Sequence, residues 1–165
     1  MADGLEIERK YLIAYPRTED LTGAEQVEIA QTYLSAEAGE THRVRRWVCR
    51  GETRYFETRK RPITHVTCRE EEREVDEVTY RSLMAVRDPA RKTVEKVRYR
   101  LPYGGHIVEI DVYPFWRDRA ILEVELSRED EEIALPDGIR VIREVTDDSR
   151  YKNVSLACRV PNDPI

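Results

Sequence analysis

Carboxylate side chains recur two residues apart in three separate segments of the 165-residue chain. The pairs are Glu6 and Glu8, Glu109 and Asp111, and Glu123 and Glu125. Residues two apart on a β-strand point to the same face, so each segment would present two carboxylates side by side. Mg²⁺ and Mn²⁺ prefer oxygen ligands of this kind. Paired carboxylates could therefore hold a divalent cation if the strands that carry them face one another.

Cationic side chains show the same spacing in other segments. They are Arg43 and Arg45, and Lys96, Arg98 and Arg100. Like charges held side by side repel each other unless an opposite charge neutralises them. Arginine presents a planar fork to phosphate oxygens, and lysine presents a mobile point charge. Cations kept apart from the carboxylates in this way could bind a polyanion.

A period of two residues dominates the chain, which is typical of β-strands. Regular alternation predicts strands over residues 5–12, 25–34, 42–48, 54–60, 93–101, 105–113 and 121–126, with less regular candidates at 69–75 and 139–145. Few helices are expected: residues 76–86, where Asp76 could cap the N-terminus, residues 147–157, and a short turn at 128–132. Many short strands with few helices favour a meandering sheet or a barrel.

Two architectures explain the alternation. An ordinary antiparallel sheet has one dry face and one wet face. A sheet curled into a barrel would instead bring the charged faces together around one lumen. The polar faces are almost entirely charged and keep acid apart from base, which the ordinary sheet does not easily explain. The pattern alone nevertheless leaves both architectures open.

At these charged segments the sequence resembles the CYTH family, also called triphosphate tunnel metalloenzymes, and in particular its compact bacterial members. The matching segments, in chain order, are residues 6–10 (its ExExK signature), 31–35, 43–45 (RxR), 58–60 (TxK), 96–99 (KxRY), 109–113 and 123–126 (two acidic strands), and 144–153 (the C-terminal pattern of short members). Two segments depart from the family pattern, because residues 60–74 and 114–119 lack the glycines expected there.

The resemblance implies an α+β, mainly β fold: a closed eight-stranded antiparallel β-barrel, the triphosphate tunnel, with a few flanking helices. We expect residues 1–165 to form a single domain of this kind. The resemblance also implies roles for particular residues. The metal ligands would be Glu6, Glu8, Glu123, Glu125 and Asp111, with Glu109 as a possible support, and the substrate-binding residues would be Arg43, Arg45, Lys60, Lys96 and Arg98.

Lys10 and Tyr33 are the candidate catalytic residues. A lysine among other cations can have a lowered pKa, so Lys10 with Tyr33 could assist proton removal. The alternative, that Lys10 only binds phosphate, stays open. The strand at residues 69–75 can be registered in two ways, and a slip of one residue exchanges its faces. We expect Glu72 and Glu74 to face inward there, as possible further site residues.

The resemblance implies an enzyme, a divalent-metal-dependent triphosphatase. The leading expectation is hydrolysis of inorganic triphosphate to pyrophosphate and phosphate, with Mg²⁺ or Mn²⁺ as the cofactor. The alternatives are a nucleoside or thiamine triphosphatase, an adenylate cyclase with the same fold, and a non-catalytic module that binds polyphosphate. Retention of both ExE pairs argues against the last, because binding alone needs cations more than a complete set of metal ligands. The expected partner is a small-molecule triphosphate, and a homodimer is possible.

Composition argues against several other functions. The net charge of −5 disfavours a nucleic-acid binder. No apolar stretch approaches the roughly 20 residues of a membrane span, and no signal-peptide pattern opens the sequence, so we expect a cytoplasmic protein with no membrane partner. The three cysteines and three histidines are scattered, which fits reduced thiols and disfavours a zinc or histidine-based metal site.

Overall fold

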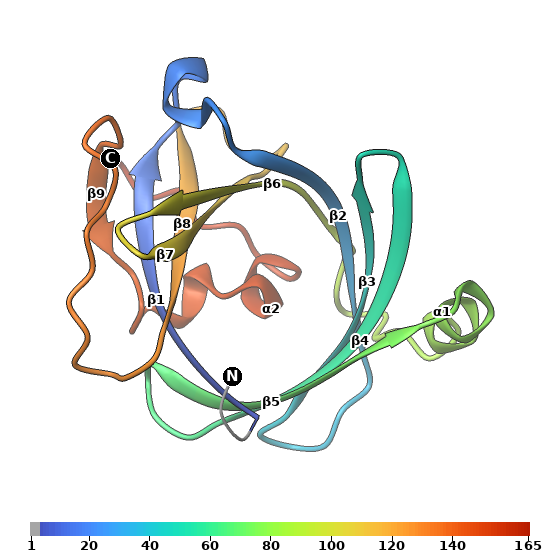
Figure 1. Cartoon of the computed structure of the whole chain (residues 1–165). Coiled ribbons are helices and arrows are strands. Elements are labelled where there is room, and N and C mark those ends of the chain that lie inside the picture. Colours follow the sequence, from blue (N-terminus) through green and yellow to red (C-terminus); the bar gives the residue numbers. More distant parts are fainter. Residues whose placement is uncertain (1–3) are drawn as a thin grey trace.

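Eight antiparallel strands close into a barrel in the computed structural model of the protein, which describes residues 4–165 (Figure 1). The strands are β1 (Leu5–Ala14), β2 (Glu25–Leu34), β3 (Thr41–Cys49), β4 (Glu52–Pro62), β5 (Thr67–Val75), β6 (Val94–Tyr103), β7 (His106–Val112) and β8 (Arg119–Leu126). They run in the order β5-β4-β3-β2-β6-β7-β8-β1, and β1 pairs back onto β5. The expected closed eight-stranded barrel is confirmed. Residues 1–3 of the expected domain lie outside the described range.

The closure between β1 and β5 is short. Only three pairs join them, beginning at Leu5↔Arg69 and ending at Ile7↔Thr67. Further along the same edge of β1, the strand β9 (Val141–Glu144) pairs with residues 11–13. The strand expected over residues 139–145 therefore pairs with this edge of β1 and is not one of the eight strands that close the barrel.

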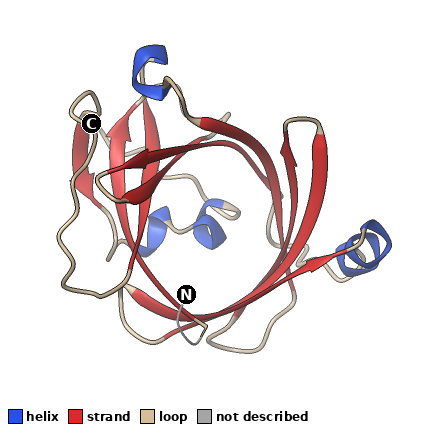
Figure 2. Cartoon of the chain, in the orientation of Figure 1, coloured by secondary structure: helices blue, strands red, loops and turns tan. Residues whose placement is uncertain are grey.

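Helices are few: those near the C-terminus lie across the opening of the barrel, and the others lie outside the ring of strands (Figure 2). The helix expected over residues 76–86 is α1 (Glu77–Met84), and the side chain of Asp76 caps it by accepting from the Thr79 N–H at 2.7 Å. A 3-10 helix, η1 (Thr18–Leu21), has no counterpart in the sequence prediction. No helix within residues 4–165 is long and apolar enough to cross a membrane.

The predicted helix over residues 147–157 is wrong as a single element. The structure has a 3-10 helix, η2 (Ser149–Tyr151), and a short α-helix, α2 (Asn153–Leu156). Lys152 between them is extended, with φ −73° and ψ 140°. The expected helical turn at residues 128–132 is also wrong, because the structure has only bends and turns there.

Two hydrophobic clusters support the barrel. The first lies inside, at the end where α2 crosses the opening in Figure 1, and joins inward residues such as Leu12 and Ile121 to Tyr151 and Leu156. The second covers the outer faces of β1, β7 and β8. Its cover includes Ile139 and Leu135 from the segment between β8 and β9. One end of the lumen is thus filled by apolar side chains, and the charged side chains line the remainder.

Candidate active site

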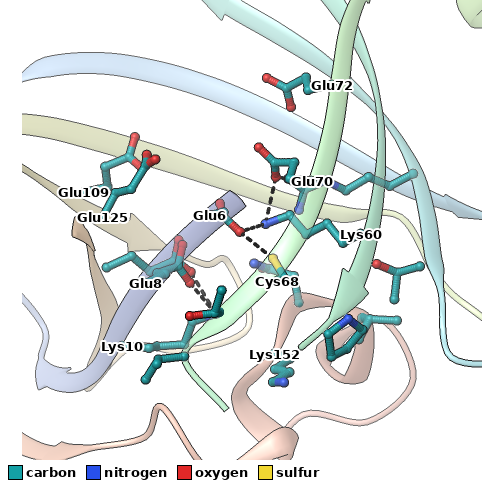
Figure 3. A pocket seen from close by; sticks show the side chains of 18 of the residues that line it. Glu6, Glu8, Lys10, Lys60, Cys68, Glu70, Glu72, Glu109, Glu125 and Lys152 are labelled. Atoms are coloured by element: carbon teal, nitrogen blue, oxygen red, sulfur yellow. Dashed lines mark hydrogen bonds and ion pairs between the residues drawn. The ribbon is translucent and has the colours of Figure 1, made fainter. Parts of the chain in front are cut away.

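A cavity of about 340 Å³ occupies the charged part of the lumen (Figure 3). Twelve of the residues expected at the site line it: Glu6, Glu8, Lys10, Tyr33, Arg43, Arg45, Lys60, Glu72, Arg98, Glu109, Glu123 and Glu125. They come from all eight strands of the barrel. Strand alternation, together with closure of the sheet, therefore gathers side chains that lie more than one hundred residues apart in the sequence.

The carboxylates of β1 and β8 lie opposite one another because of the strand register. Glu8 pairs with Glu125 and Lys10 pairs with Glu123 in the antiparallel ladder. The Lys10 Nζ lies 2.9 Å from Glu123 Oε1 and 3.7 Å from Glu8 Oε1. Burial lowers the pKa of Lys10, but the charges of Glu123 and Glu8 outweigh it and raise this pKa above its ordinary value. Lys10 is thus held as a cation between two carboxylates.

Glu8 and Glu125 are carboxylates without sufficient neutralisation. Burial, followed by repulsion from Glu123, raises the pKa of Glu8 to about 8. Burial and then repulsion from Glu6 raise the pKa of Glu125. Within residues 4–165, no three acidic, histidine or cysteine side chains are already arranged around a metal position. The donor set nevertheless fits a hard divalent cation, which would supply the positive charge that these carboxylates lack.

The opposite side of the cavity is cationic. Arg43 and Arg45 on β3 and Lys60 on β4 form what we call the cationic wall. The Arg43 Nη2 lies 4.0 Å from Glu70 Oε2, and its buried Nε has no hydrogen-bond partner in the described structure. Burial, followed by repulsion from Arg43, lowers the pKa of Arg45 to about 10. Arg45 is therefore incompletely neutralised, and its guanidinium group, together with that of Arg43, could bind phosphate oxygens.

Carboxylates of β1 and β5 partly occupy the cationic wall. Lys60 contacts Glu6 and lies 3.0 Å from Glu70 Oε2 (Figure 3). Arg45 Nη2 donates to Glu72 Oε2 at 2.6 Å. These carboxylates hold the wall together in the absence of an anion.

Three of the expected site residues lie outside the cavity lining. Lys96 and Asp111 are almost fully buried and form an ion pair of 2.6 Å, and Arg98 binds the same Asp111 carboxylate through Nε at 2.7 Å and Nη2 at 2.8 Å. Burial lowers the pKa of Lys96 to about 8 despite this pairing. Glu74 is exposed and pairs with Arg54 at 2.6 Å. Lys96 and Asp111 thus sit behind the cavity, with Arg98 between them and the lumen.

The β5 strand has the face that was expected, displaced toward its start. Glu72 lines the cavity, whereas Glu74 lies beyond it and Glu70, which was not predicted, takes the inner place. Glu70 and Glu72 share a face because they are two residues apart, so the sequence signal for Glu70 was present. Cys68 continues this face, and its Sγ lies 3.2 Å from Glu6 Oε2.

The C-terminal segment adds residues that alternation could not reveal. Thr146 and Lys152 line the cavity although neither belongs to a strand. Lys152 has no ion-pair partner among residues 4–165. The hydroxyl of Tyr33 accepts from Gln31 Nε2 at 2.6 Å, and Tyr33 is 4% exposed. The cavity therefore has contributions from all eight barrel strands and from the C-terminal segment.

Comparisons with known proteins agree with this geometry. No protein-family model matches the chain. An inorganic triphosphatase of Nitrosomonas europaea is 33% identical in an alignment of 160 residues that covers 94% of this chain and 99% of that protein. The solved structure of the inorganic triphosphatase NE1496 gives a TM-score of 0.57 at 30% identity and covers 95% of this chain and 97% of that one. A putative adenylyl cyclase from Hippeastrum, with a TM-score of 0.53 at 13% identity over 74% of this chain and 80% of its own, shares the fold alone.

The similarity to the Nitrosomonas protein extends over nearly the full length of both chains. It includes the closed barrel that carries the charged lumen, and the same barrel recurs in a much more distant adenylyl cyclase-like structure. By this extent of identity and by its barrel, the chain belongs to the CYTH, or triphosphate tunnel, family.

Proposed function

We propose that the protein hydrolyses inorganic triphosphate to pyrophosphate and phosphate with the help of Mg²⁺ or Mn²⁺. One observation carries this proposal: the same cavity has under-neutralised carboxylates on β1 and β8 and, on β3 and β4, a cationic wall in which Arg45 is incompletely neutralised. A polyanion that arrives with a divalent cation satisfies both sides at once. The activity of the Nitrosomonas relative, an inorganic triphosphatase, supports the choice of inorganic triphosphate.

The proposed division of labour follows from the positions of the side chains. Glu6, Glu8, Glu123 and Glu125 would hold the cation, which neutralises phosphate charge and favours attack by water at the terminal phosphorus. The cationic wall and Arg98 would bind and align the phosphate oxygens. Asp111 would act indirectly by orienting Arg98 through its bidentate contact. Lys96 would neutralise Asp111.

The environment of Lys10 bears on the two roles that the sequence left open. A proton acceptor must spend part of its time uncharged at the working pH. The neighbouring carboxylates raise the pKa of Lys10, so its ammonium is stabilised in the absence of ligand. This favours Lys10 as a ligand of phosphate oxygen over Lys10 as the group that removes a proton.

The lining of the cavity favours an inorganic substrate over a nucleotide or thiamine triphosphate. Most of the lining side chains are charged or carry hydroxyl groups, and Tyr33 and Trp47 are the only Phe, Tyr or Trp residues among them. Tyr33 is 4% exposed and belongs to the inner hydrophobic cluster. An organic group would need an apolar or stacking surface, and Trp47 alone offers little of one.

A substrate panel tests the proposal. Turnover of triphosphate, ATP, thiamine triphosphate and longer polyphosphate would be measured with Mg²⁺ and with Mn²⁺. We expect the highest kcat/KM with inorganic triphosphate and no turnover in excess chelator. Tight binding of triphosphate without turnover would support the polyphosphate-binding module instead, and formation of cyclic AMP from ATP would support the cyclase.

A further inference from the structure

The stretch of β1 that carries Glu8 and Lys10 lies at a gap in the barrel wall. On one edge of β1, pairing with β5 ends at Ile7, and pairing with β9 begins at Tyr11. Neither strand reaches residues 8–10 on this edge. The backbone beneath two central side chains of the proposed site is therefore held there by loops instead of by a strand.

Two loops supply the missing hydrogen bonds. The Glu8 N–H donates to the Val66 carbonyl, in the loop between β4 and β5, at 2.9 Å. The Lys10 carbonyl accepts from the Val145 N–H at 2.8 Å. The Lys10 N–H donates to Oγ1 of Thr146 at 3.0 Å. Of these three bonds only the last depends on a side chain, and therefore on the type of residue at that position.

Thr146 is also joined to a charged pair on the outside of the barrel. Its hydroxyl donates to Glu144 Oε1 at 2.7 Å, and Arg9 binds the same carboxylate through Nε at 3.0 Å and Nη2 at 2.8 Å. Donation to a carboxylate polarises the hydroxyl and makes its oxygen a better acceptor for the Lys10 N–H. Thr146 is buried, so removal of its hydroxyl would leave that N–H without a protein partner.

We propose that Thr146 is a positioning residue, whose hydroxyl fixes the backbone of β1 at Lys10 and thereby aims Lys10 and Glu8 into the lumen. The inference rests on the proposed triphosphatase function. A shift of this backbone would disturb the contacts of the Lys10 ammonium with Glu123, at 2.9 Å, and with Glu8, at 3.7 Å. Misplacement of Glu8 would lower turnover, because Glu8 is proposed to hold the cation that favours attack by water. Most of the proposed phosphate contacts come from the cationic wall on other strands, so binding of the substrate depends less on Thr146.

The first test replaces Thr146 by Val, which keeps the branched shape and removes the hydroxyl. We expect kcat for triphosphate to fall about tenfold or more, because small misplacements of site groups are costly, while KM stays within about twofold. Thr146→Ser restores the hydroxyl and should bring kcat back to within about threefold of wild type. A folded Thr146→Val protein with wild-type kcat would overturn the proposal, as would a Thr146→Ser protein as impaired as the Val variant.

Thr32→Val provides a matched control. Thr32 is another buried threonine, and its hydroxyl is 2.8 Å from that of Thr93, outside the proposed site. This variant makes the same substitution at a buried threonine and loses a hydroxyl–hydroxyl hydrogen bond away from the site, so it reports the structural cost of such a change. Its kcat should stay near the wild-type value. Equal losses of kcat in Thr32→Val and Thr146→Val would show that Thr146 contributes stability only.

A readout without substrate separates this inference from the proposed function. The exchange rate of the Lys10 amide hydrogen, measured by NMR in the metal-free protein, should rise about tenfold or more in Thr146→Val, because its acceptor is gone. The Val44 amide on β3 should be unchanged. Glu144→Gln, at a partly exposed position, should give a smaller rise and a smaller loss of kcat. If the wild type turned over no triphosphate but the Lys10 amide still responded, the proposed function would fail and the positioning role would stand. An unchanged Lys10 amide would overturn the positioning role.

Discussion

Glu8 and Asp111 are both carboxylates on inward positions of the barrel, yet their surroundings differ. Asp111 is bound by Lys96 and Arg98, and these charges outweigh burial and lower its pKa. Glu8 faces Glu123 and Glu6, and burial together with these charges raises its pKa to about 8. The negative charge of Asp111 is thus neutralised by neighbouring side chains of the protein, whereas that of Glu8 is not. Both are carboxylates two residues from another carboxylate on the same strand face, and their partners distinguish the two roles.

Replacement of Glu8 by Gln tests this difference at the residue scale. Gln keeps the shape and removes a carboxyl group whose ionisation is unfavourable in the metal-free protein, so we expect Glu8→Gln to raise the melting temperature in chelator slightly. Added Mn²⁺ should stabilise the wild type, because a ligand that binds only the folded state raises its stability, and this response should be lost in the variant. Thermal melts with chelator and with Mn²⁺ measure both effects.

Glu95→Gln is the control for that experiment. Glu95 lies exposed on the outer face of β6, so its replacement removes a carboxylate of the same size away from the cavity. It should respond to Mn²⁺ as the wild type does. A Glu8→Gln protein that is stabilised by Mn²⁺ to the wild-type extent would show that Glu8 is not a metal ligand.

Arg43→Ala should weaken substrate binding while the barrel stays folded. Its nearest carboxylate is 4.0 Å away, so little ion pairing is lost with the side chain. A charge-assisted contact with phosphate is worth about 1.5–3 kcal/mol, which corresponds to a rise in KM of roughly 10- to 100-fold. Steady-state kinetics with triphosphate measure the change, with circular dichroism to follow the fold. Arg59→Ala, on the outer face of β4, is the control and should leave KM unchanged. If Arg43→Ala instead unfolded the protein, Arg43 would be a structural residue and not a substrate-binding one.

At the scale of elements, the Lys96–Asp111–Arg98 cluster joins β6 to β7 behind the cavity. Lys96→Met should destabilise the fold by about 3 kcal/mol, because removal of one partner leaves a buried carboxylate with less neutralisation. Urea unfolding measures this change. Arg100→Met on the same strand breaks partly exposed ion pairs with Glu25 and Glu109 and should cost less than about 1 kcal/mol. Equal losses in the two variants would contradict the structural role that we assign to Lys96.

The strands were largely predictable from the sequence. Side chains along each strand of a barrel alternate between the lumen and the outside, which gives the sequence a period of two residues. The C-terminal elements were not predictable in this way. The pattern over residues 147–157 resembles one helix, but Asp148 accepts from the Arg150 N–H and starts a separate 3-10 turn, and Lys152 then leaves the helical conformation. These are local choices between competing hydrogen bonds, and sequence periodicity does not record them.

The sequence predicted which strand faces carry the candidate site, but it did not predict which side chains would contact one another there. Alternation placed Lys96 and Asp111 inward correctly, yet it could not indicate that they would bind each other behind the lumen. It also could not find Lys152 or Thr146, which reach the cavity from outside the strands. Depth within the barrel depends on how far neighbouring strands are staggered, and that stagger is a property of the whole sheet.

At the scale of the whole molecule, the seam between β1 and β5 is the place where the barrel has least pairing. Three residue pairs close it, whereas eight join β1 to β8. Glu6 lies on one side of the seam, and Glu70 with the cationic wall lies on the other. Lys60 bridges the two sides by contacting both Glu6 and Glu70. A triphosphate with its cation would add contacts across the same line.

Ligand binding should therefore protect the seam more than any other part of the wall. Hydrogen exchange of the wild type would be compared with and without Mn²⁺ and an imido analogue of triphosphate that resists hydrolysis. We expect peptides covering residues 5–8 and 67–70 to exchange fastest among the eight barrel strands in the free protein, because local opening needs the fewest broken bonds there, and to slow about tenfold or more with ligand. Peptides covering residues 25–30 of β2, which carry no side chain that lines the cavity and pair with β6, serve as the internal control and should change little. Equal slowing of both regions would mean that the ligand stabilises the fold globally, and slowing confined to residues 25–30 would place the binding site away from the seam.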